Sequence, residues 1–130
     1  MLHQSKGTLC YTAPRKVFVL VDPEIGSFYR SMIPKTVPIS PPKFATHITV
    51  VRREPLPKAE LFGIHDGEII EFEYDTEIHH DETYYWLNAY SKRLEEIREE
   101  LGLPVHSQYT RPPDNSWAFH ITIGNLKNAS

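Results

Sequence analysis

Two short segments of the chain carry the same three residues, a histidine, an isoleucine and a threonine, followed by an aliphatic residue. They are His47-Ile-Thr49-Val50 and His120-Ile-Thr122-Ile123. Residues two apart in a β-strand point to the same face of the sheet. As strands, both segments would present an imidazole and a hydroxyl on one face and two β-branched side chains on the other.

Histidine and threonine in this arrangement suit the cleavage of a phosphodiester bond. One histidine can take a proton from the attacking hydroxyl or water and another can protonate the leaving oxygen, because the reference pKa of histidine is about 6.5. Threonine hydroxyls can donate hydrogen bonds to the non-bridging phosphate oxygens. We therefore predict that His47, Thr49, His120 and Thr122 are catalytic, with no metal ion and no cofactor.

The surroundings of the two segments are also similar. Each follows a double proline, Pro41-Pro42 or Pro112-Pro113, then an aromatic residue and an alanine. A single His-Ile-Thr segment would be interpreted as an ordinary strand, whereas two in similar contexts favour a functional role. This faint repeat predicts two related half-units placed symmetrically about one cleft.

Two His-x-Thr motifs, one in each half of a small domain, resemble the 2H phosphoesterase superfamily. The resemblance implies a bilobal domain whose two sheets flank a cleft, with His47 and His120 as the acid/base pair and the two threonines as phosphate ligands. Within the superfamily, the short length and the context PPKFATHITVVRRE look most like the bacteriophage anti-CBASS proteins. Those are small enzymes that destroy cyclic oligonucleotide signals such as 3′,3′-cyclic GMP-AMP.

The leading hypothesis is therefore a metal-independent phosphodiesterase that hydrolyses cyclic oligonucleotide second messengers and so evades CBASS defence. A second hypothesis is RNA-end processing, by opening a 2′,3′-cyclic phosphate or cleaving a 2′,5′ linkage. A third is a catalytically silent nucleotide-binding module. The residues do not indicate which histidine is the acid, or whether water or a 2′-hydroxyl attacks.

Hydrophobic patterning predicts a mixture of short strands and two helices. Asp22 as N-cap and Pro23 at the first helical position would start one helix, with Ile25, Phe28 and Met32 facing inward. Strands are expected at 16–21, 45–52 and 118–124, a β-hairpin within 68–90, and a second helix at 91–101. This order predicts one α+β domain over residues 1–130, with two antiparallel sheets flanking a central cleft and helices outside.

Composition limits the class of partner and the compartment. The net charge of −3 argues against a binder of long nucleic acid, which needs a basic face, but allows a short cyclic or linear oligonucleotide. No apolar run has the length of a membrane span, and residues 1–11 lack an apolar signal core. One cysteine, Cys10, fits a reducing cytoplasm, that of the host if a phage encodes the chain. The oligomeric state stays open.

Several other residues are candidates for contacts with substrate. Tyr11, Tyr109 and Trp117 could stack on bases, as could Trp86, and Arg111 could bind phosphate. Alternation along an undistorted strand would put Arg53 on the face of His47 and Arg52 on the other face. The run from His79 to Glu82 is interpreted as a polar hairpin turn in preference to a metal site, and Cys10 as a bystander thiol.

Overall fold

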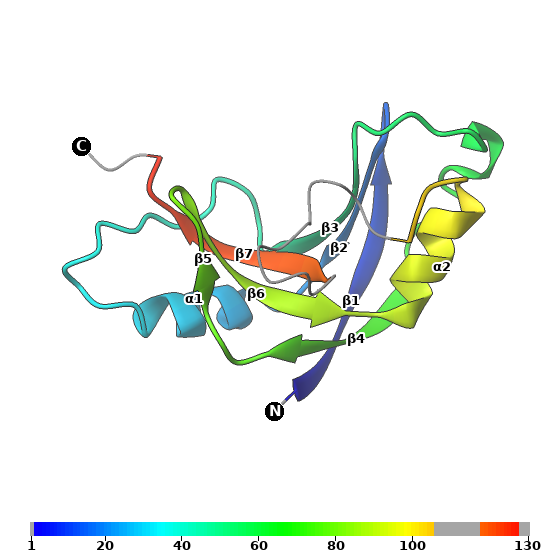
Figure 1. The fold of residues 1–130 in the computed structure, drawn as a ribbon. Helices are drawn as coiled ribbons and strands as arrows, with labels where there is room; N and C mark the ends of the chain where they lie inside the picture. The colour runs from blue at the N-terminus through cyan, green and yellow to red at the C-terminus, as the bar shows by residue number, and fades with distance from the viewer. Residues whose placement is uncertain (1, 106–117, 128–130) are drawn as a thin grey trace.

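The structure is a computed structural model that describes residues 2–105 and 118–127. Its elements, in chain order, are β1 (Leu2–Thr12), β2 (Lys16–Leu20), α1 (Pro23–Ser31), β3 (His47–Arg52), a 3-10 helix (Ala59–Leu61), β4 (Ile69–Asp75), β5 (His79–His80), β6 (Tyr84–Tyr90), α2 (Lys92–Glu100) and β7 (Phe119–Asn125) (Figure 1). Most of the predicted strands and both predicted helices are present. β1 was not predicted, because its polar residues hide the strand pattern.

The strands form one antiparallel sheet that closes on itself. Neighbouring strands follow the order β4-β1-β2-β3-β7-β6-β5, and β4 also pairs with β6 through Glu73–Tyr90 and Tyr74–Ala89. Six strands thus form a closed barrel, and β5 pairs with β6 beside β4. Figure 1 shows α1 and α2 at opposite ends of the strands. The hydrophobic core fills the inside of this barrel.

The predicted bilobal α+β domain, with two sheets flanking a central cleft and helices outside, is wrong. The sheet is a single closed barrel, and the structure has only two short α-helices within the described residues. The physical reason is β1, which pairs with β4 from Leu2–Asp75 to Thr8–Ile69 and so joins the two half-sheets along the side away from the motifs. With β3 and β7 also paired, no open cleft separates the half-sheets.

The two predicted half-units are nevertheless visible in the connectivity. In the first half, β1 and β2 precede α1, and β3 then pairs with β2. In the second half, β4 and β6 precede α2, and β7 then pairs with β6. Each half ends on its motif strand, and the halves meet where β3 pairs with β7 and where β1 pairs with β4. The arrangement has an approximate twofold axis between the motif strands.

The first helix begins as predicted but buries a different face. The Asp22 carboxylate accepts a hydrogen bond from the backbone N–H of Glu24 at 2.9 Å, and Pro23 occupies the first turn. Tyr29, four residues after Ile25, turns inward with it, so Phe28 and Met32 are 58% and 59% exposed. The expectation that Phe28 and Met32 face the core is wrong.

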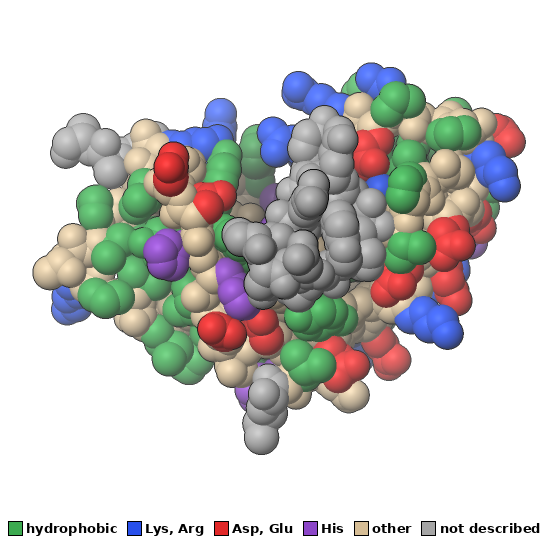
Figure 2. Space-filling model, viewed as in Figure 1, with side chains coloured by type: hydrophobic (Ala, Val, Ile, Leu, Met, Phe, Trp, Pro, Cys, Tyr) green, Lys and Arg blue, Asp and Glu red, His purple; other side chains and the backbone are tan. Residues whose placement is uncertain are grey.

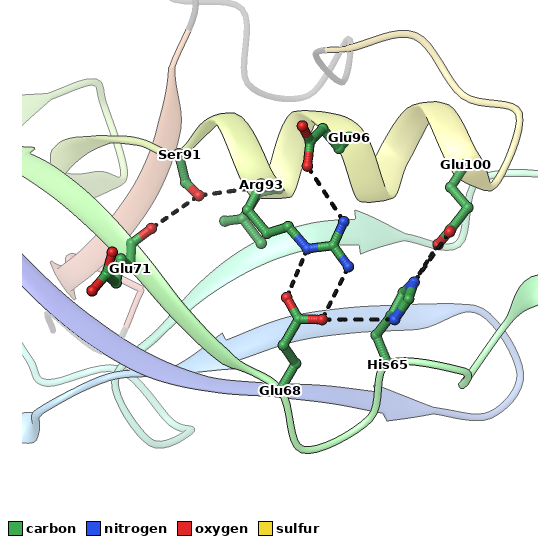
Figure 3. Close-up of polar contacts among 8 residues, drawn as sticks. His65, Glu68, Glu71, Ser91, Arg93, Glu96 and Glu100 are labelled. Atoms are coloured by element: carbon green, nitrogen blue, oxygen red, sulfur yellow. Dashed lines mark hydrogen bonds and ion pairs between the residues drawn. The ribbon is translucent and has the colours of Figure 1, made fainter.

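The second helix is anchored at its cap, its apolar stripe and its polar side. Ser91 accepts from the backbone N–H of Leu94 at 3.3 Å and donates to the carbonyl oxygen of Glu71 at 3.1 Å. Leu94, Ile97 and Leu101 are buried, as predicted. Arg93 donates two hydrogen bonds to Glu68, as Figure 3 shows.

The α-helices of the described residues are α1 and α2, with nine residues each. Neither is long and apolar enough to cross a membrane.

The predicted hairpin within residues 68–90 is only partly present. β4 pairs mainly with β1, and the strand that faces β6 across the turn is the two-residue β5. Asp81 stabilises this turn, because its Oδ1 accepts from the backbone N–H groups of Thr83 at 2.8 Å and Tyr84 at 2.7 Å. The expected polar turn from His79 to Glu82 is therefore present only in part, because His79 and His80 belong to strand β5 and the turn begins at Asp81.

One buried arginine connects α2 to the strand that carries the first motif. Arg98 is 0% exposed, and its guanidinium donates to Glu54, to the carbonyl oxygen of Val50 at 2.7 Å and to that of Pro104 at 2.8 Å. A buried cation of this kind stabilises the contact only while every partner remains, and each of the three guanidinium nitrogens of Arg98 has at least one partner.

We predict that Arg98→Met destabilises the protein far more than Arg93→Met. Removing one partner of a buried pair costs about 3–5 kcal/mol, because the other charge is left buried. A partly exposed pair such as Arg93 with Glu68 contributes about 1 kcal/mol or less. Urea unfolding of both variants at pH 7 measures the difference, and equal losses would show that Arg98 is not the anchor of α2.

Candidate functional site

The pairing of β3 with β7 brings the two His-Ile-Thr motifs side by side. Ile48 pairs with Ile121 in antiparallel register. Continuing that register by one residue on each side puts His47 opposite Thr122 and His120 opposite Thr49. The two histidines are then diagonal neighbours, whose Cα atoms lie about 7–8 Å apart in such a ladder. The two motif histidines therefore lie close together on adjacent strands.

The motif side chains alternate between the two faces of the barrel wall, as the sequence predicts. Ile48, Val50, Ile121 and Ile123 are at most 1% exposed and belong to the core. The two histidines and two threonines are half-buried on the opposite face, called the outer face below. The chemistry-bearing groups thus share a surface, and the aliphatic groups fix both strands from beneath.

Each motif histidine contacts an aromatic side chain from the neighbouring strand of its own half. Phe18 of β2 is the cross-strand partner of Thr49, and its ring meets that of His47 edge-on at 5.7 Å between centroids. Trp86 of β6 is the partner of Thr122, and its ring stacks on His120 at 4.9 Å. Phe18 and Trp86 are equivalent in the two halves and restrict the orientations of the imidazoles.

Both motif strands carry a bulge at the fourth motif residue. The partners on β2 skip Val50, since Phe18 pairs with Thr49 and Val17 with Val51. The partners on β6 skip Ile123 in the same way, since Trp86 pairs with Thr122 and Tyr85 with Gly124. Bulges are common beside active sites, where they change the direction of a side chain.

Each bulged residue is held by an arginine from the helix of the opposite half. Arg98 of α2 donates to the carbonyl oxygen of Val50 at 2.7 Å, and Arg30 of α1 donates to that of Ile123 at 2.9 Å. The motif strands are thereby fixed from both ends of the barrel. The sequence patterns did not indicate these arginines. The available signal was a basic residue in the last turn of each helix.

The hydrogen bond of His47 determines which of its ring nitrogens is free. Nδ1 lies 2.7 Å from the carbonyl oxygen of Ala45. A carbonyl oxygen only accepts, so Nδ1 carries the hydrogen. In the neutral ring, Nε2 then holds the lone pair and is the nitrogen available to a ligand.

His120 lies in a less polar environment. Its Nε2 is buried and has no hydrogen-bond partner within residues 2–105 and 118–127. Burial, and to a smaller extent the nearby His79, lowers the pKa of His120 from 6.5 to about 4, while Asp81 opposes the shift. The ring is therefore neutral at pH 7. An unpaired buried polar atom costs about 1–3 kcal/mol, and such atoms are a mark of catalytic and ligand-binding groups.

A hydrogen-bonded chain positions the tryptophan against His120. Strands β7 and β5 lie on opposite sides of β6, so Trp86 lies between His120 and His79. The ring of His79 stacks on that of Trp86 with 6.1 Å between the ring centroids. The indole N–H of Trp86 donates to Asn88 at 3.1 Å, and the backbone N–H of Asn88 donates to Asp75 at 3.0 Å. Asp75 also bonds His79 at 2.8 Å. His120 is thus packed against a fixed surface.

The other predicted substrate contacts do not join this cluster. Tyr11 pairs with Val17 and points to the core side of the sheet, where its ring meets Phe62 edge-on at 5.1 Å. Burial and nearby Glu100 raise the pKa of its hydroxyl to about 12. The structure therefore places Tyr11 on the face opposite to the histidines. Tyr109, Arg111 and Trp117 lie outside the described residues.

The bulge at Val50 reverses the expected placement of the arginines after the first motif. Arg52 pairs with Lys16, which shares the outer face with Phe18. Arg52 therefore lies on the face of His47, where Arg53 was expected, and Arg53 instead ends the strand with a φ of 56°. The expectation assumed an undistorted strand, and the extra residue breaks the alternation.

Neither Cys10 nor the histidine-rich turn offers a second reactive site. Burial and Asp66 raise the pKa of the Cys10 thiol, which disfavours the nucleophilic thiolate. Within residues 2–105 and 118–127, no group of three or more His, Cys, Asp or Glu side chains is arranged to hold a metal ion.

Comparisons of the chain with protein-family models, with curated proteins and with solved structures found no match.

We predict that burial of His120 makes the protein less stable as the pH falls from 6.5 to 4. Its folded pKa of about 4 lies below the unfolded value, so only the unfolded chain binds this proton in that window. The free energy of unfolding is therefore unaffected by this group above pH 6.5 and falls by roughly 3 kcal/mol between pH 6.5 and pH 4.

Urea unfolding of wild type and His120→Gln at pH 7.5 and pH 4.5 tests this expectation. The stability of the wild type relative to the variant should fall by most of that amount at the lower pH. An NMR titration of the His120 imidazole with a midpoint near 6.5 would contradict it.

Proposed function

We propose that the chain is a phosphodiesterase that cleaves short oligonucleotides without a metal ion, with His47 and His120 as its acid/base pair. The observation that carries the proposal is the pairing of Ile48 with Ile121, which sets two imidazoles and two threonine hydroxyls on one face. The motif-level resemblance to 2H phosphoesterases supports the same chemistry. The symmetric bulges and their arginine anchors support it independently.

The approximate twofold axis suits an in-line displacement at phosphorus. A phosphate above the Ile48–Ile121 pair would have one imidazole toward the attacking oxygen and the other toward the leaving oxygen. The hydroxyls of Thr49 and Thr122 would donate to the two non-bridging oxygens, whose negative charge needs fixed donors. Holding both proton-transfer groups in position removes much of the entropic part of the barrier.

The unequal surroundings of the histidines support a proposal for their roles. His120 is neutral at pH 7 and has an unpaired Nε2, so it accepts the proton of the attacking hydroxyl or water. The new P–O bond forms as the bond to the leaving oxygen breaks, and that oxygen takes a proton from Nε2 of His47. The hydrogen bond from Nδ1–H of His47 to Ala45 leaves Nε2 as the nitrogen that meets the leaving oxygen.

Net charge and resemblance together select the substrate class. A chain of net charge −3 is a poor match for a long polyanion, whereas one or two phosphates need only local donors. We propose a cyclic oligonucleotide second messenger such as 3′,3′-cyclic GMP-AMP, removed in the cytoplasm to counter CBASS defence. A 2′,3′-cyclic phosphate or a 2′,5′ linkage is the alternative substrate that the same groups could cleave.

We predict turnover in the presence of EDTA and its loss on substitution of either histidine. His47→Ala and His120→Ala should each lower kcat by about 100- to 10,000-fold, the usual contribution of one acid or base. Thr49→Val and Thr122→Val should each lower kcat by a smaller factor. The substrates are 3′,3′-cyclic GMP-AMP, 2′,5′-oligoadenylate and RNA that ends in a 2′,3′-cyclic phosphate. Abolition of turnover by EDTA would overturn the metal-free mechanism.

The pH dependences of kcat/KM and of kcat report on the free enzyme and on the enzyme–substrate complex, respectively. The acid limb of kcat/KM reports the base of the free enzyme and should fall near pH 4, the pKa of His120. A bound phosphate anion favours the imidazolium, so the acid limb of kcat should lie at higher pH. An acid limb of kcat/KM at pH 6 or above would exclude His120 as the base.

A catalytically silent nucleotide-binding module is the second candidate. The observation that favours it is the burial of Nε2 of His120, the nitrogen that must meet the substrate. Under this alternative, wild type binds the nucleotides without turnover, and His47→Ala still binds them. Calorimetry beside the turnover assay distinguishes the two candidates.

A further inference from the structure

An exposed group of aromatic and basic side chains lies beside His47. It consists of Lys16, Phe18, Lys43, Phe44 and Arg52 and is called the Phe44 patch. The side chain of Phe44 is 63% exposed. The ammonium group of Lys16 lies 5.0 Å from the centre of its ring, and that of Lys43 lies 5.9 Å away. Two cations thus lie near an aromatic ring that the core does not use.

The Phe44 patch is continuous with the proposed catalytic site. The ammonium group of Lys16 also lies over the Phe18 ring, at 5.3 Å, and that ring touches His47 at 5.7 Å. Arg52 is exposed, is the cross-strand partner of Lys16 and belongs to the same outer face. Side-chain contacts therefore lead from His47 through Phe18 and Lys16 to Phe44.

Within residues 2–105 and 118–127, no carboxylate neutralises the positive charges of the patch. Lys16, Lys43 and Arg52 form no ion pair with any carboxylate in the described part of the chain, whereas Arg93 and Arg98 do. Figure 2 shows Lys and Arg side chains gathered along the upper edge of the molecule. Uncompensated cations around an exposed aromatic ring favour an anionic ligand with a flat apolar part.

We propose that the Phe44 patch binds the nucleotide on the His47 side of the scissile phosphodiester. Its base stacks on the Phe44 ring, and Lys16 and Arg52 bind the next phosphate along the substrate. The inference rests on the proposed function, since His47 defines which phosphodiester is cleaved. It goes further by assigning the leaving nucleotide to a specific surface, because His47 protonates the leaving oxygen. A nucleotide is the occupant that matches both the ring and the charges.

The binding test uses 3′,3′-cyclic GMP-AMP in a His120→Ala background, where turnover does not interfere. Phe44→Ala should raise Kd by about 5- to 100-fold, the loss expected for one stacked base. Phe44→Leu keeps an apolar side chain but removes the π-face and should recover only part of the affinity. Lys16→Gln should weaken binding and reduce its dependence on salt. Phe28→Ala, at an equally exposed phenylalanine on α1, is the matched control and should leave Kd unchanged.

Kinetics in the otherwise wild-type chain give a second readout. Phe44→Ala should raise KM by a similar factor and change kcat little, because the ring holds the leaving nucleotide and takes no part in proton transfer. Equal effects of Phe44→Ala and Phe28→Ala, or an unchanged Kd in Phe44→Ala, would overturn the inference about the Phe44 patch. If turnover by the wild type were normal, the proposed function would still stand.

The opposite outcome, in which the proposed function fails and the Phe44 patch is confirmed, can also be recognised. If no nucleotide is turned over, but binding is lost in Phe44→Ala and kept in Phe28→Ala, the proposed function fails and the Phe44 patch stands as a nucleotide-binding site. Tighter binding of a 20-nucleotide single-stranded RNA than of the cyclic dinucleotide, again lost in Phe44→Ala, would overturn the assigned occupant.

Discussion

The antiparallel contact between β3 and β7 is the constraint on which the rest of the site depends. The paired residues, Ile48 and Ile121, are both fully buried, so the core fixes the register. A shift of either strand by one residue would turn its motif histidine into the core and its isoleucine outward. The same pairing joins the two half-sheets. This contact therefore determines the geometry of the motifs, and together with the β1–β4 pairing it closes the barrel.

The two motif strands are held by equivalent contacts, but the two motif histidines have different surroundings. Equivalent bulges, arginine anchors and aromatic partners hold the two motif strands in the same way. The environments then differ. His120 is stacked on Trp86 and its Nε2 is buried, whereas His47 bonds a backbone carbonyl and adjoins the exposed Phe44 patch. A reaction that needs one base and one acid requires this kind of difference between otherwise equivalent positions.

The sequence by itself determined the local features. Period-two alternation in the motif segments predicted that the histidines and threonines share one face, because adjacent side chains of a strand point to opposite faces. Cap residues determined where the helices begin, since Asp22 and Ser91 satisfy free backbone N–H groups. These predictions depend on contacts within a few residues, which the local sequence encodes. The internal repeat likewise predicted the two half-units.

The tertiary structure alone decided how these parts combine. Closure of the barrel depends on β1, whose residues pair with residues of β4 that are 61 (Thr8 with Ile69) to 73 (Leu2 with Asp75) positions away, and no local pattern in its polar residues revealed that pairing. The bulge at Val50, which moves Arg52 to the outer face beside His47, arises from the register between strands and not from the strand itself. The orientation of Tyr11 toward the core and the burial of His120 also depend on neighbours distant in sequence. Register, strand pairing and burial are properties of long-range contacts, and a single segment of sequence does not specify them.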